Sequence, residues 1–187
     1  TIPCLSDNYA YLAHDDETGA TALIDAPEAG PILDALAQTG WRLSDVLITH
    51  HHWDHLDGLA DILAAHPARV VGAAGEAQRL PPLDTALVEG DTVSIGASVG
   101  QVIDVSGHTI NHLAFHFPGS RAVFTADSLM AMGCGRVFEG TKPQMHASLQ
   151  KLAAMPRDTV VYSGHEYTLS NAKFALTIDP ENPDLIS

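Results

Sequence analysis

Residues 50–55 contain four histidines and one aspartate, and they follow directly on the apolar run 46–48. A short run of Val, Leu and Ile is typical of a buried strand. Residues 59–65, just after the cluster, have apolar residues at helical spacing. A histidine-rich surface loop or a cloning tag would also concentrate histidine. Here, however, the cluster is internal, contains tryptophan and aspartate, and is held between a strand and a helix, which favours a built site.

The spacing within this cluster suggests metal binding. His50 and His52 lie two residues apart beyond an extended segment, so their side chains can project to the same side. Both could then bind one metal ion through imidazole nitrogens. Asp54 and His55 follow at once, and a turn there would direct them to a neighbouring point. Zinc and iron both accept such a mixture of imidazole and carboxylate ligands.

Three further candidates, His108, Asp127 and His165, each come just after a predicted strand. Functional residues on short loops at strand ends are a common arrangement on a rigid scaffold. Gly107 and Gly164 directly precede the two histidines and permit tight backbone geometry there. Each candidate alone could be an ordinary polar loop residue. Together with the cluster they provide five imidazoles and two carboxylates, a complete set for two metal ions.

Strand patterns and helix patterns alternate along both halves of the chain. This alternation predicts an α/β fold with two sheets and outer helices, an αββα sandwich. The expected strands are 9–14, 21–25, 46–48, a strand from 70, 87–88, 92–95, 98–105, 113–117, 121–125 and 159–162, and the expected helices are 31–39, 59–65, 146–155 and 169–176.

Composition excludes several classes of partner. The 187 residues carry a formal net charge of -14, so no basic stripe is present to bind a nucleic-acid backbone. No apolar run has the length of a membrane span. The two cysteines, Cys4 and Cys134, are expected to be reduced thiols of a cytoplasmic protein.

The segment Thr49-His50-His51-His52-Trp53-Asp54-His55 matches the T-H-x-H-x-D-H signature of the metallo-β-lactamase superfamily. Within that superfamily the chain resembles the glyoxalase II (hydroxyacylglutathione hydrolase) family, over essentially its whole length and in the same order. The other motifs that carry this resemblance are Ser6-Asp7-Asn8-Tyr9, Gly107-His108-Thr109, Phe124-Thr125-Ala126-Asp127, Gly133-Cys134-Gly135-Arg136, Glu139-Gly140-Thr141 and Gly164-His165-Glu166-Tyr167-Thr168.

The resemblance implies a dinuclear centre with two divalent metal ions per chain. Zinc is the expected metal, with iron or manganese as the alternatives. His51 and Trp53 occupy variable positions of the signature and are not expected to be ligands. The implied ligands are His50, His52 and His108 for the first ion, Asp54, His55 and His165 for the second, and Asp127 as the bridge between them.

The resemblance also implies an activity, the second step of methylglyoxal detoxification. A metal-bound hydroxide would cleave S-D-lactoylglutathione, an S-(2-hydroxyacyl)glutathione thioester, to D-lactate and glutathione. Asp54 and Asp127 are the expected catalytic residues. Arg136, Phe138 and Tyr167 are the expected substrate contacts, although relatives have tyrosine where this chain has Phe138.

Residues 1–168 are predicted to form the catalytic domain, and 169–187 the start of a C-terminal helical region. Family members usually continue into that region, which supplies further basic contacts to glutathione, so we expect the sequence to be truncated there. The expected protein is a monomer whose partner is a small-molecule glutathione thioester, with no nucleic-acid or membrane partner.

Other functions are compatible with the same ligands. A persulfide dioxygenase-like enzyme with one iron shares the histidine signature but leaves some second-site ligands unused, and residues 139–141 and 164–168 favour the hydrolase. A β-lactamase is disfavoured, because nothing here resembles its cysteine-containing second metal site. A non-catalytic metal-binding module explains the ligands but not their ordered set beside a basic residue.

Overall fold

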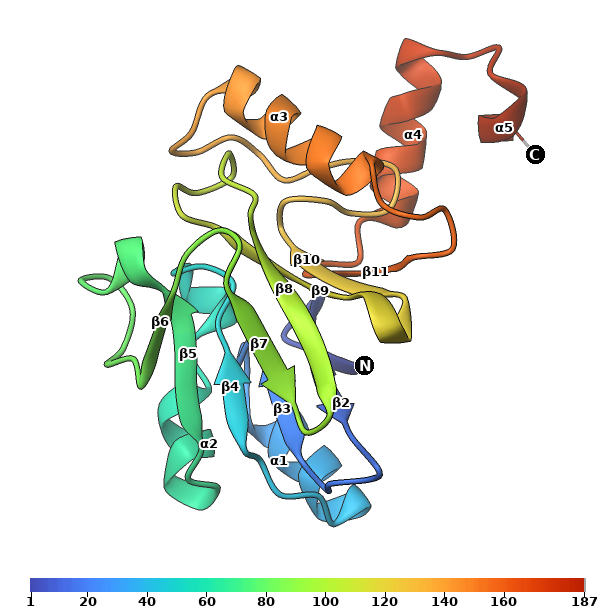
Figure 1. Ribbon diagram of the computed structural model, residues 1–187. Coiled ribbons are helices and arrows are strands. Elements are labelled where there is room, and N and C mark those ends of the chain that lie inside the picture. The colour runs from blue at the N-terminus through green and yellow to red at the C-terminus, as the bar shows by residue number, and fades with distance from the viewer. Residues whose placement is uncertain (187) are drawn as a thin grey trace.

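Two β-sheets lie face to face in the structure, a computed structural model that describes residues 1–186 (Figure 1). The first sheet has six strands in the order β1 to β6. Its first three strands pair antiparallel, and the pairs from β3 to β6 are parallel. The strands are β1 Ile2–Cys4, β2 Asn8–His14, β3 Thr21–Ile24, β4 Asp45–Leu47, β5 Arg69–Ala73 and β6 Thr85–Leu87.

The second sheet has five strands in the order β11-β10-β9-β8-β7. Its pairs are antiparallel except for β10 with β11, which are parallel. The strands are β7 Thr92–Ile95, β8 Ser98–Asp104, β9 Leu113–Phe117, β10 Ala122–Ala126 and β11 Val160–Ser163.

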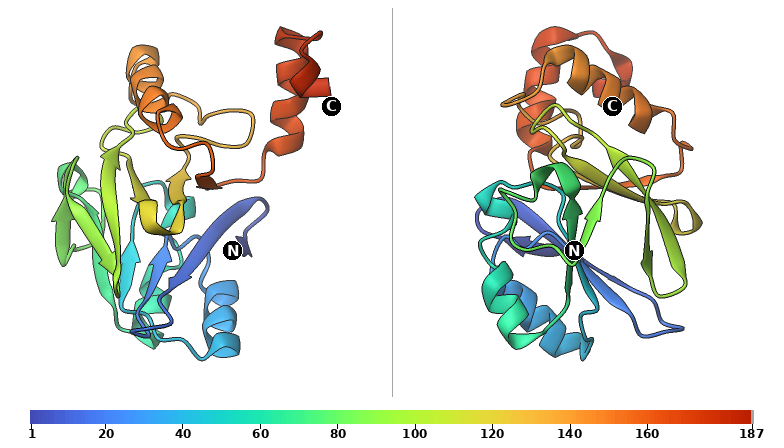
Figure 2. Two further views of the ribbon diagram at one scale, coloured as in Figure 1. Left: turned by 45° about the vertical axis from the view of Figure 1, so that its right-hand side comes forward. Right: turned by 60° about the vertical axis from the view of Figure 1, so that its left-hand side comes forward.

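Helices cover the outer faces of both sheets, as the turned views in Figure 2 show. α1 (Ala29–Thr39) and α2 (Leu59–Ala65) pack on the first sheet in one apolar cluster. α3 (Lys142–Ala153) lies on the second sheet, where its Leu152 packs with Val123. The order of layers is helix, sheet, sheet, helix, and the predicted αββα sandwich is confirmed.

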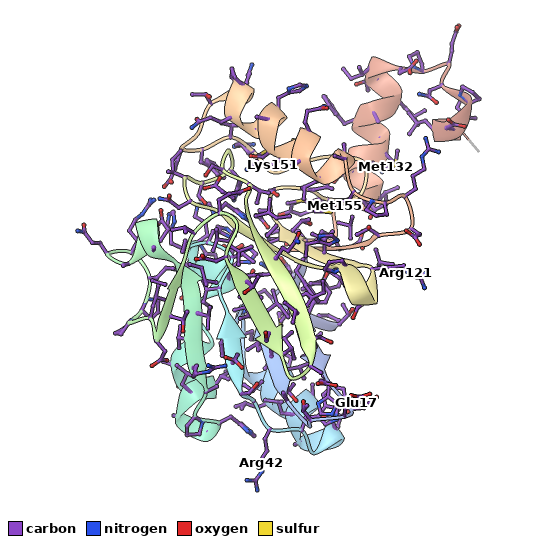
Figure 3. The ribbon with its side chains drawn as sticks, in the orientation of Figure 1. Glu17, Arg42, Arg121, Met132, Lys151 and Met155 are labelled. Atoms are coloured by element: carbon purple, nitrogen blue, oxygen red, sulfur yellow. The ribbon has the colours of Figure 1, made fainter. Side chains whose placement is uncertain are left out.

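The core between the sheets is made by the side chains that point inward from both of them. Leu47 and Val71 contribute from the first sheet, and the fully buried Phe115 contributes from the second. Figure 3 shows Arg42 projecting at the end of the sandwich opposite α3. At the other end, short loops leave the strands and carry the predicted site residues.

α4 (Thr168–Ile178) and α5 (Pro183–Ile186) follow the last strand and bury no residue. α4 stands clear of the sandwich in the left view of Figure 2, and its Phe174 and Ile178 are exposed. The division of the chain at residue 168 stays a prediction. No helix within residues 1–186 is both long and apolar enough to span a membrane.

Three elements differ from the sequence prediction, and one of them is the short helix α5, which was not predicted. Strand β1 was not predicted, because a three-residue strand containing proline has too little alternation to recognise. α3 begins four residues before the predicted start at His146, because Thr141 and Gln144 form a capping box there. The other predicted strands and helices are present, most with ends shifted by one or two residues.

Candidate metal centre

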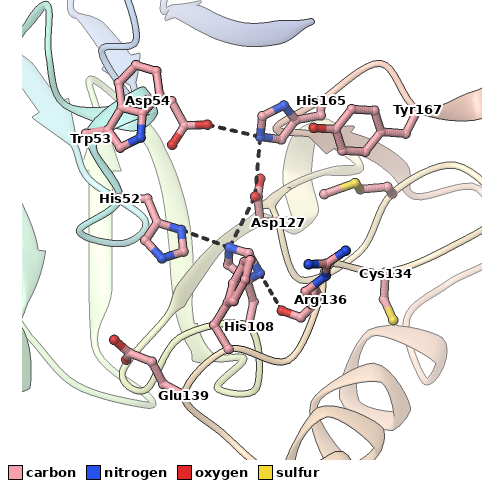
Figure 4. Close-up of a pocket in the computed structure, with 13 residues that line it drawn as sticks. His52, Trp53, Asp54, His108, Asp127, Cys134, Arg136, Glu139, His165 and Tyr167 are labelled. Carbon is pink, nitrogen blue, oxygen red and sulfur yellow. Dashed lines mark hydrogen bonds and ion pairs between the residues drawn. The ribbon is translucent and has the colours of Figure 1, made fainter.

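All seven predicted ligands lie at one end of the sandwich, and both sheets contribute to the group. Figure 4 shows five of them, His52, Asp54, His108, Asp127 and His165. The short helix η1 (Trp53–His55) provides the turn expected within the histidine cluster. The first sheet provides four ligands, His50 and His52 after β4 and Asp54 and His55 in η1. The second sheet provides three, His108 after β8, Asp127 after β10 and His165 after β11.

His50, His52 and His108 form the first group, in which one ligand atom from each lies within 4.8 Å of the others. His50 Nε2 is 3.1 Å from His52 Nδ1, which is 3.0 Å from His108 Nε2. The other nitrogen of His108, Nδ1, lies 2.7 Å from the carbonyl oxygen of Arg136. An Nδ1–H donated to that carbonyl leaves the Nε2 lone pair directed at the group, as a metal ligand requires.

Asp54, His55 and His165 form the second group, again within 4.8 Å of one another. Each histidine has a carboxylate on its far nitrogen. His55 Nδ1 is 2.8 Å from Asp25 Oδ2, and His165 Nδ1 is 2.9 Å from Asp7 Oδ1. Both rings therefore direct Nε2 inward, in the carboxylate–histidine arrangement common around metal ions.

Asp127 lies between the two groups and is 5% exposed. Its Oδ2 is 3.2 Å from His108 Nε2 and 3.3 Å from His165 Nε2, while its Oδ1 is 3.4 Å from His55 Nε2. Burial by itself would raise the pKa of Asp127, but hydrogen bonds from His165 and His55 outweigh it and hold the pKa well below the ordinary value. This carboxylate can reach both groups at once.

The two groups fit two cations. His55 Nε2 and Asp127 Oδ1 are buried and point inward, and their contact with each other at 3.4 Å is too long to satisfy either atom fully. An ion bound in the second group would give these two atoms a partner, and an ion bound in the first group would do the same for its converging nitrogens. These two groups coincide with the predicted division of ligands between two ions, whereas a third group of close ligand atoms, Asp25, His50 and His55, crosses it. The ligand roles themselves stay a prediction.

The two groups differ in how readily they take up protons. Burial lowers the pKa of His50, His52 and His108, so these imidazoles are neutral at neutral pH. Burial also acts to lower the pKa of His55, but hydrogen bonds with Asp127 and Asp25 raise it to about 10. The pKa of His165 is likewise raised against the effect of burial, chiefly by its hydrogen bond with Asp127.

Glycines allow the close approach of the loops. A Cβ at Gly164 would lie 2.3 Å from Asp127 Oδ1, so a side chain there would displace the carboxylate. Gly107 has φ +153°, and a Cβ there would lie 2.8 Å from the backbone of Met145. Ala126, just before Asp127, takes a positive φ of 42° without being glycine, which indicates local strain at the bridging residue.

A cleft of about 750 Å³ opens over the metal centre. Arg136, Phe138 and Tyr167, the three predicted substrate contacts, all line it. The guanidinium of Arg136 lies 5.7 Å from the centre of the Phe138 ring, and Tyr167 stacks on His165 with ring centres 4.9 Å apart. Cys134, a free thiol, is also part of the wall. The cleft thus combines one cation with aromatic faces.

Sequence reasoning missed the polar side chains that support these ligands. Asp25 is 2% exposed and accepts hydrogen bonds from the backbone and hydroxyl of Thr49, as well as contacting His55. It directly follows the buried strand β3, so the strand-end argument that found the ligands could have found it too. Asp7 belongs to a motif that was recognised without a role.

A second polar network lies behind the histidine cluster. His51, the histidine not expected to be a ligand, turns to the buried carboxylate of Glu76 at 3.1 Å and to Glu139 at 3.3 Å. Arg79 bonds both carboxylates. Glu139 in turn accepts a hydrogen bond from the backbone N–H of Ile110 on the loop that carries His108. The network therefore joins loops on both sides of the first group.

Comparisons with known proteins agree with this geometry. The model of the metallo-beta-lactamase superfamily matches residues 7–165. A hydroxyacylglutathione hydrolase from Jannaschia sp. is 66% identical over 100% of this chain and 73% of that protein.

Solved structures share the fold. The crystal structure of ETHE1 from Myxococcus xanthus aligns with a TM-score of 0.77 and 33% identity, over 87% of this chain and 72% of that one. The protein TTHA1623, in a di-iron-bound form, aligns with a TM-score of 0.75 and 28% identity, over 89% of this chain and 91% of its own. With the group of three histidines and the group of Asp54, His55 and His165, the superfamily match and the di-iron-bound neighbour indicate a dinuclear metal site. The chain belongs to the metallo-beta-lactamase superfamily and, within it, to the hydroxyacylglutathione hydrolase family.

Proposed function

We propose that this chain hydrolyses S-(2-hydroxyacyl)glutathione thioesters, with S-D-lactoylglutathione as the substrate and D-lactate and glutathione as the products. The observation that carries the proposal is the pairing of two groups of metal-ligating side chains with a cleft that contains Arg136. Relatives more than 60% identical to this chain are named hydroxyacylglutathione hydrolase, which supports the same reaction.

The chain's own residues prepare the site for a hydrolytic attack. Two bound divalent ions would supply Lewis acidity and lower the pKa of a water near the cleft floor. Asp54 belongs to the second group, and its Oδ2 accepts a hydrogen bond from the side-chain amide of Asn8 at 3.2 Å. A carboxylate fixed in this way can orient the attacking water. Because a thiolate is a good leaving group, the reaction needs no strong general acid.

Substrate binding would use the cation and the aromatic faces of the cleft. The guanidinium of Arg136 can form a charge-assisted hydrogen bond with a carboxylate of the tripeptide. Phe138 offers an apolar face where relatives have a tyrosine hydroxyl, and Tyr167 provides a hydroxyl at the opposite wall. Because the chain carries a net charge of -14, an arginine at the cleft is unusual in its surroundings and offers a place for a substrate carboxylate.

The choice of metal and the state of the protein are part of the proposal. Imidazole and carboxylate donors in these two groups suit zinc, with iron or manganese as the alternatives. We further propose a cytoplasmic monomer with no nucleic-acid or membrane partner, which size-exclusion chromatography and localisation of the protein would test.

The decisive experiment measures release of free thiol from S-D-lactoylglutathione by the metal-loaded protein. We expect turnover that is lost on chelation and restored by metal. Arg136→Ala should raise KM by about tenfold to a hundredfold, the cost of one hydrogen bond to a charged group, with a smaller effect on kcat. Arg42→Ala, which removes the same charge at the opposite end of the sandwich, is the matched control.

Two results would contradict the proposal. If the protein leaves the thioester intact but consumes oxygen with glutathione persulfide, it is a dioxygenase. If it binds metal and does neither, it is a non-catalytic binding module. Metal analysis adds a further check, because one ion per chain would exclude the dinuclear arrangement.

A further inference from the structure

The loop between β1 and β2, together with the first residues of β2, carries the motif Ser6-Asp7-Asn8-Tyr9. The proposed chemistry uses only Asn8 of this motif, as a partner of Asp54. This loop lies far from the metal ligands in sequence but contacts the second group directly. Asn8 forms an isolated β-bridge with His165, which joins the first sheet to the end of the second.

Asp7 contacts the ring of His165 on the side away from the metal centre. Its Oδ1 lies 2.9 Å from His165 Nδ1, and 5% of the histidine side chain is exposed. The inward nitrogen, Nε2, lies 3.3 Å from Asp127 and 3.5 Å from Asp54. An Nδ1–H donated to Asp7 leaves the Nε2 lone pair directed at those carboxylates.

Asn8 holds the other ligand of the same group. It is 4% exposed, and its Nδ2 donates to the backbone oxygen of Asp54 at 3.0 Å and to its Oδ2 at 3.2 Å. These two contacts fix both the backbone and the rotation of the carboxylate. Truncating Asn8 would leave that carboxylate free to turn away from the cleft.

The loop itself is anchored on both sides. Leu5, with φ +50°, donates its backbone N–H to Glu28 Oε2 at 2.8 Å. On the other side Tyr9 donates its N–H to the carbonyl of Gly164, and Glu166 donates its N–H to the carbonyl of Asp7, both at 2.8 Å. Backbone bonds on either side of His165 therefore set the position from which Asp7 and Asn8 act.

We propose that Asp7 and Asn8 are positioning residues for the second metal ion, Asp7 by setting the tautomer and orientation of His165 and Asn8 by fixing Asp54. The inference rests on the two-metal centre of the proposed function but not on its thioester substrate. No contact of either side chain with His50, His52 or His108 is present in the described part of the chain. The first ion should therefore be unaffected by changes at either position.

Metal titration of the metal-free protein tests this assignment. Cobalt(II) is the probe, because its visible absorption reports geometry at each ion and its stoichiometry can be counted. Asp7→Ala and Asn8→Ala should each weaken one of the two binding steps by about tenfold to a hundredfold, the usual effect of removing such a partner, and leave the other step unchanged. Asp7→Asn, which keeps an acceptor oxygen for Nδ1, should recover part of the loss.

Tyr9→Phe is the matched control. It removes the hydrogen bond from the Tyr9 hydroxyl to Glu166 at 3.0 Å, which crosses the same junction without touching a ligand. Two cobalt ions should bind to this variant as they do to the unaltered protein. Circular dichroism and thermal unfolding of the metal-free variants distinguish a local loss of affinity from a loss of fold.

The assignment is wrong if Asp7→Ala and Asn8→Ala both bind two ions with unaltered affinity. It is also wrong if Tyr9→Phe weakens the same step equally, because the loop would then act only as a structural junction. Loss of both steps together with intact circular dichroism would also overturn it. None of these results depends on whether the thioester is cleaved, so the proposed function can fail separately.

Discussion

The two halves of the metal centre are built on different principles. The first half, His50, His52 and His108, consists of imidazoles that burial keeps neutral, and a backbone carbonyl accepts from His108. In the second half, Asp25 contacts His55 and Asp7 contacts His165, and the pKa of both histidines is raised.

This difference places the negative charge on one side of the centre. The first half offers lone pairs that are already free, so an ion can bind there without displacing protons. The second half offers a carboxylate ligand and two histidines whose raised pKa values favour a bound proton, which an ion must displace. Asp127 belongs to both halves, since it contacts His108 on one side and His55 and His165 on the other.

Asp127→Ala should have the largest effect, because it removes a carboxylate that contacts ligands of both halves. We expect weakened binding of both ions and a loss of transition-state stabilisation of several kcal/mol, on the order of a thousandfold in kcat/KM. Metal analysis and steady-state kinetics of thiol release would measure both effects. His112→Asn is the control, because His112 is fully buried against His50 but has no hydrogen bond or ion pair with Asp127 among the described residues. If Asp127→Ala retains two ions and normal turnover, the halves are independent sites.

The two halves should also differ, by a smaller factor, in how their metal affinity changes with pH. His55, with a pKa of about 10, is protonated at neutral pH in the metal-free protein, and the raised pKa of His165 extends its protonated range to higher pH. Affinity for the second ion should therefore rise with pH by about tenfold per unit for each displaced proton. Affinity for the first ion should be flat near neutral pH and fall only in acid, below the lowered pKa values of its histidines.

Calorimetric titration with zinc at several pH values on either side of neutrality would measure both slopes. Proton release, read from buffers of different ionisation enthalpy, provides the control. If the affinities for the two ions change equally with pH, the two halves do not differ in the protonation of their histidines.

Glu139→Gln should have the smallest effect on the metal centre, because Glu139 supports the first half through His51 and the loop that carries His108. A hydrogen bond from Arg79 lowers the pKa of Glu139 from 4.5 to about 2. The ionised form is therefore favoured in the folded protein, and its contribution to stability is present above about pH 4.5 and is lost as the pH falls towards about 2. Because Arg79 is 43% exposed, solvent screening keeps this contribution below about 1 kcal/mol at neutral pH.

Urea unfolding of the variant and of the unaltered protein, at neutral and at acidic pH, measures that difference. The difference in the free energy of unfolding between the two proteins should disappear as the pH falls. The affinity for the second ion should not change, whereas a change there would show that the network around Glu139 reaches across both halves.

The sequence predicted the layers correctly, and its seven ligand candidates lie together in the structure, because both features follow local rules. Buried strands have short apolar runs, and ligands occur where those strands end, as at His108 and His165. The start of α3 was missed although the signal was present, since Thr141 and Gln144 stand at capping-box spacing. Strand β1 had no signal of its own and is defined by pairing with β2.

The supporting carboxylates could not be predicted in the same way. Asp7 is 158 residues from His165 in sequence, and Asp25 is 30 residues from His55. Whether such residues meet depends on how two sheets pack and on the register of each loop. Spacing within one motif contains no information about that. Glu76, buried behind the histidine cluster, appears from sequence alone to be an ordinary charged residue of a loop.

Because four of the seven predicted ligands come from the first sheet and three from the second, bound ions would act as cross-links between the two layers. The free energy of metal binding then adds directly to the free energy of unfolding. Each independent ion present at a hundredfold over its dissociation constant would add about 2.7 kcal/mol. A core substitution that lets the sheets slide, far from any ligand, would therefore first be detected as weakened metal binding. Metal affinity in this protein thus measures how firmly the two sheets are held together.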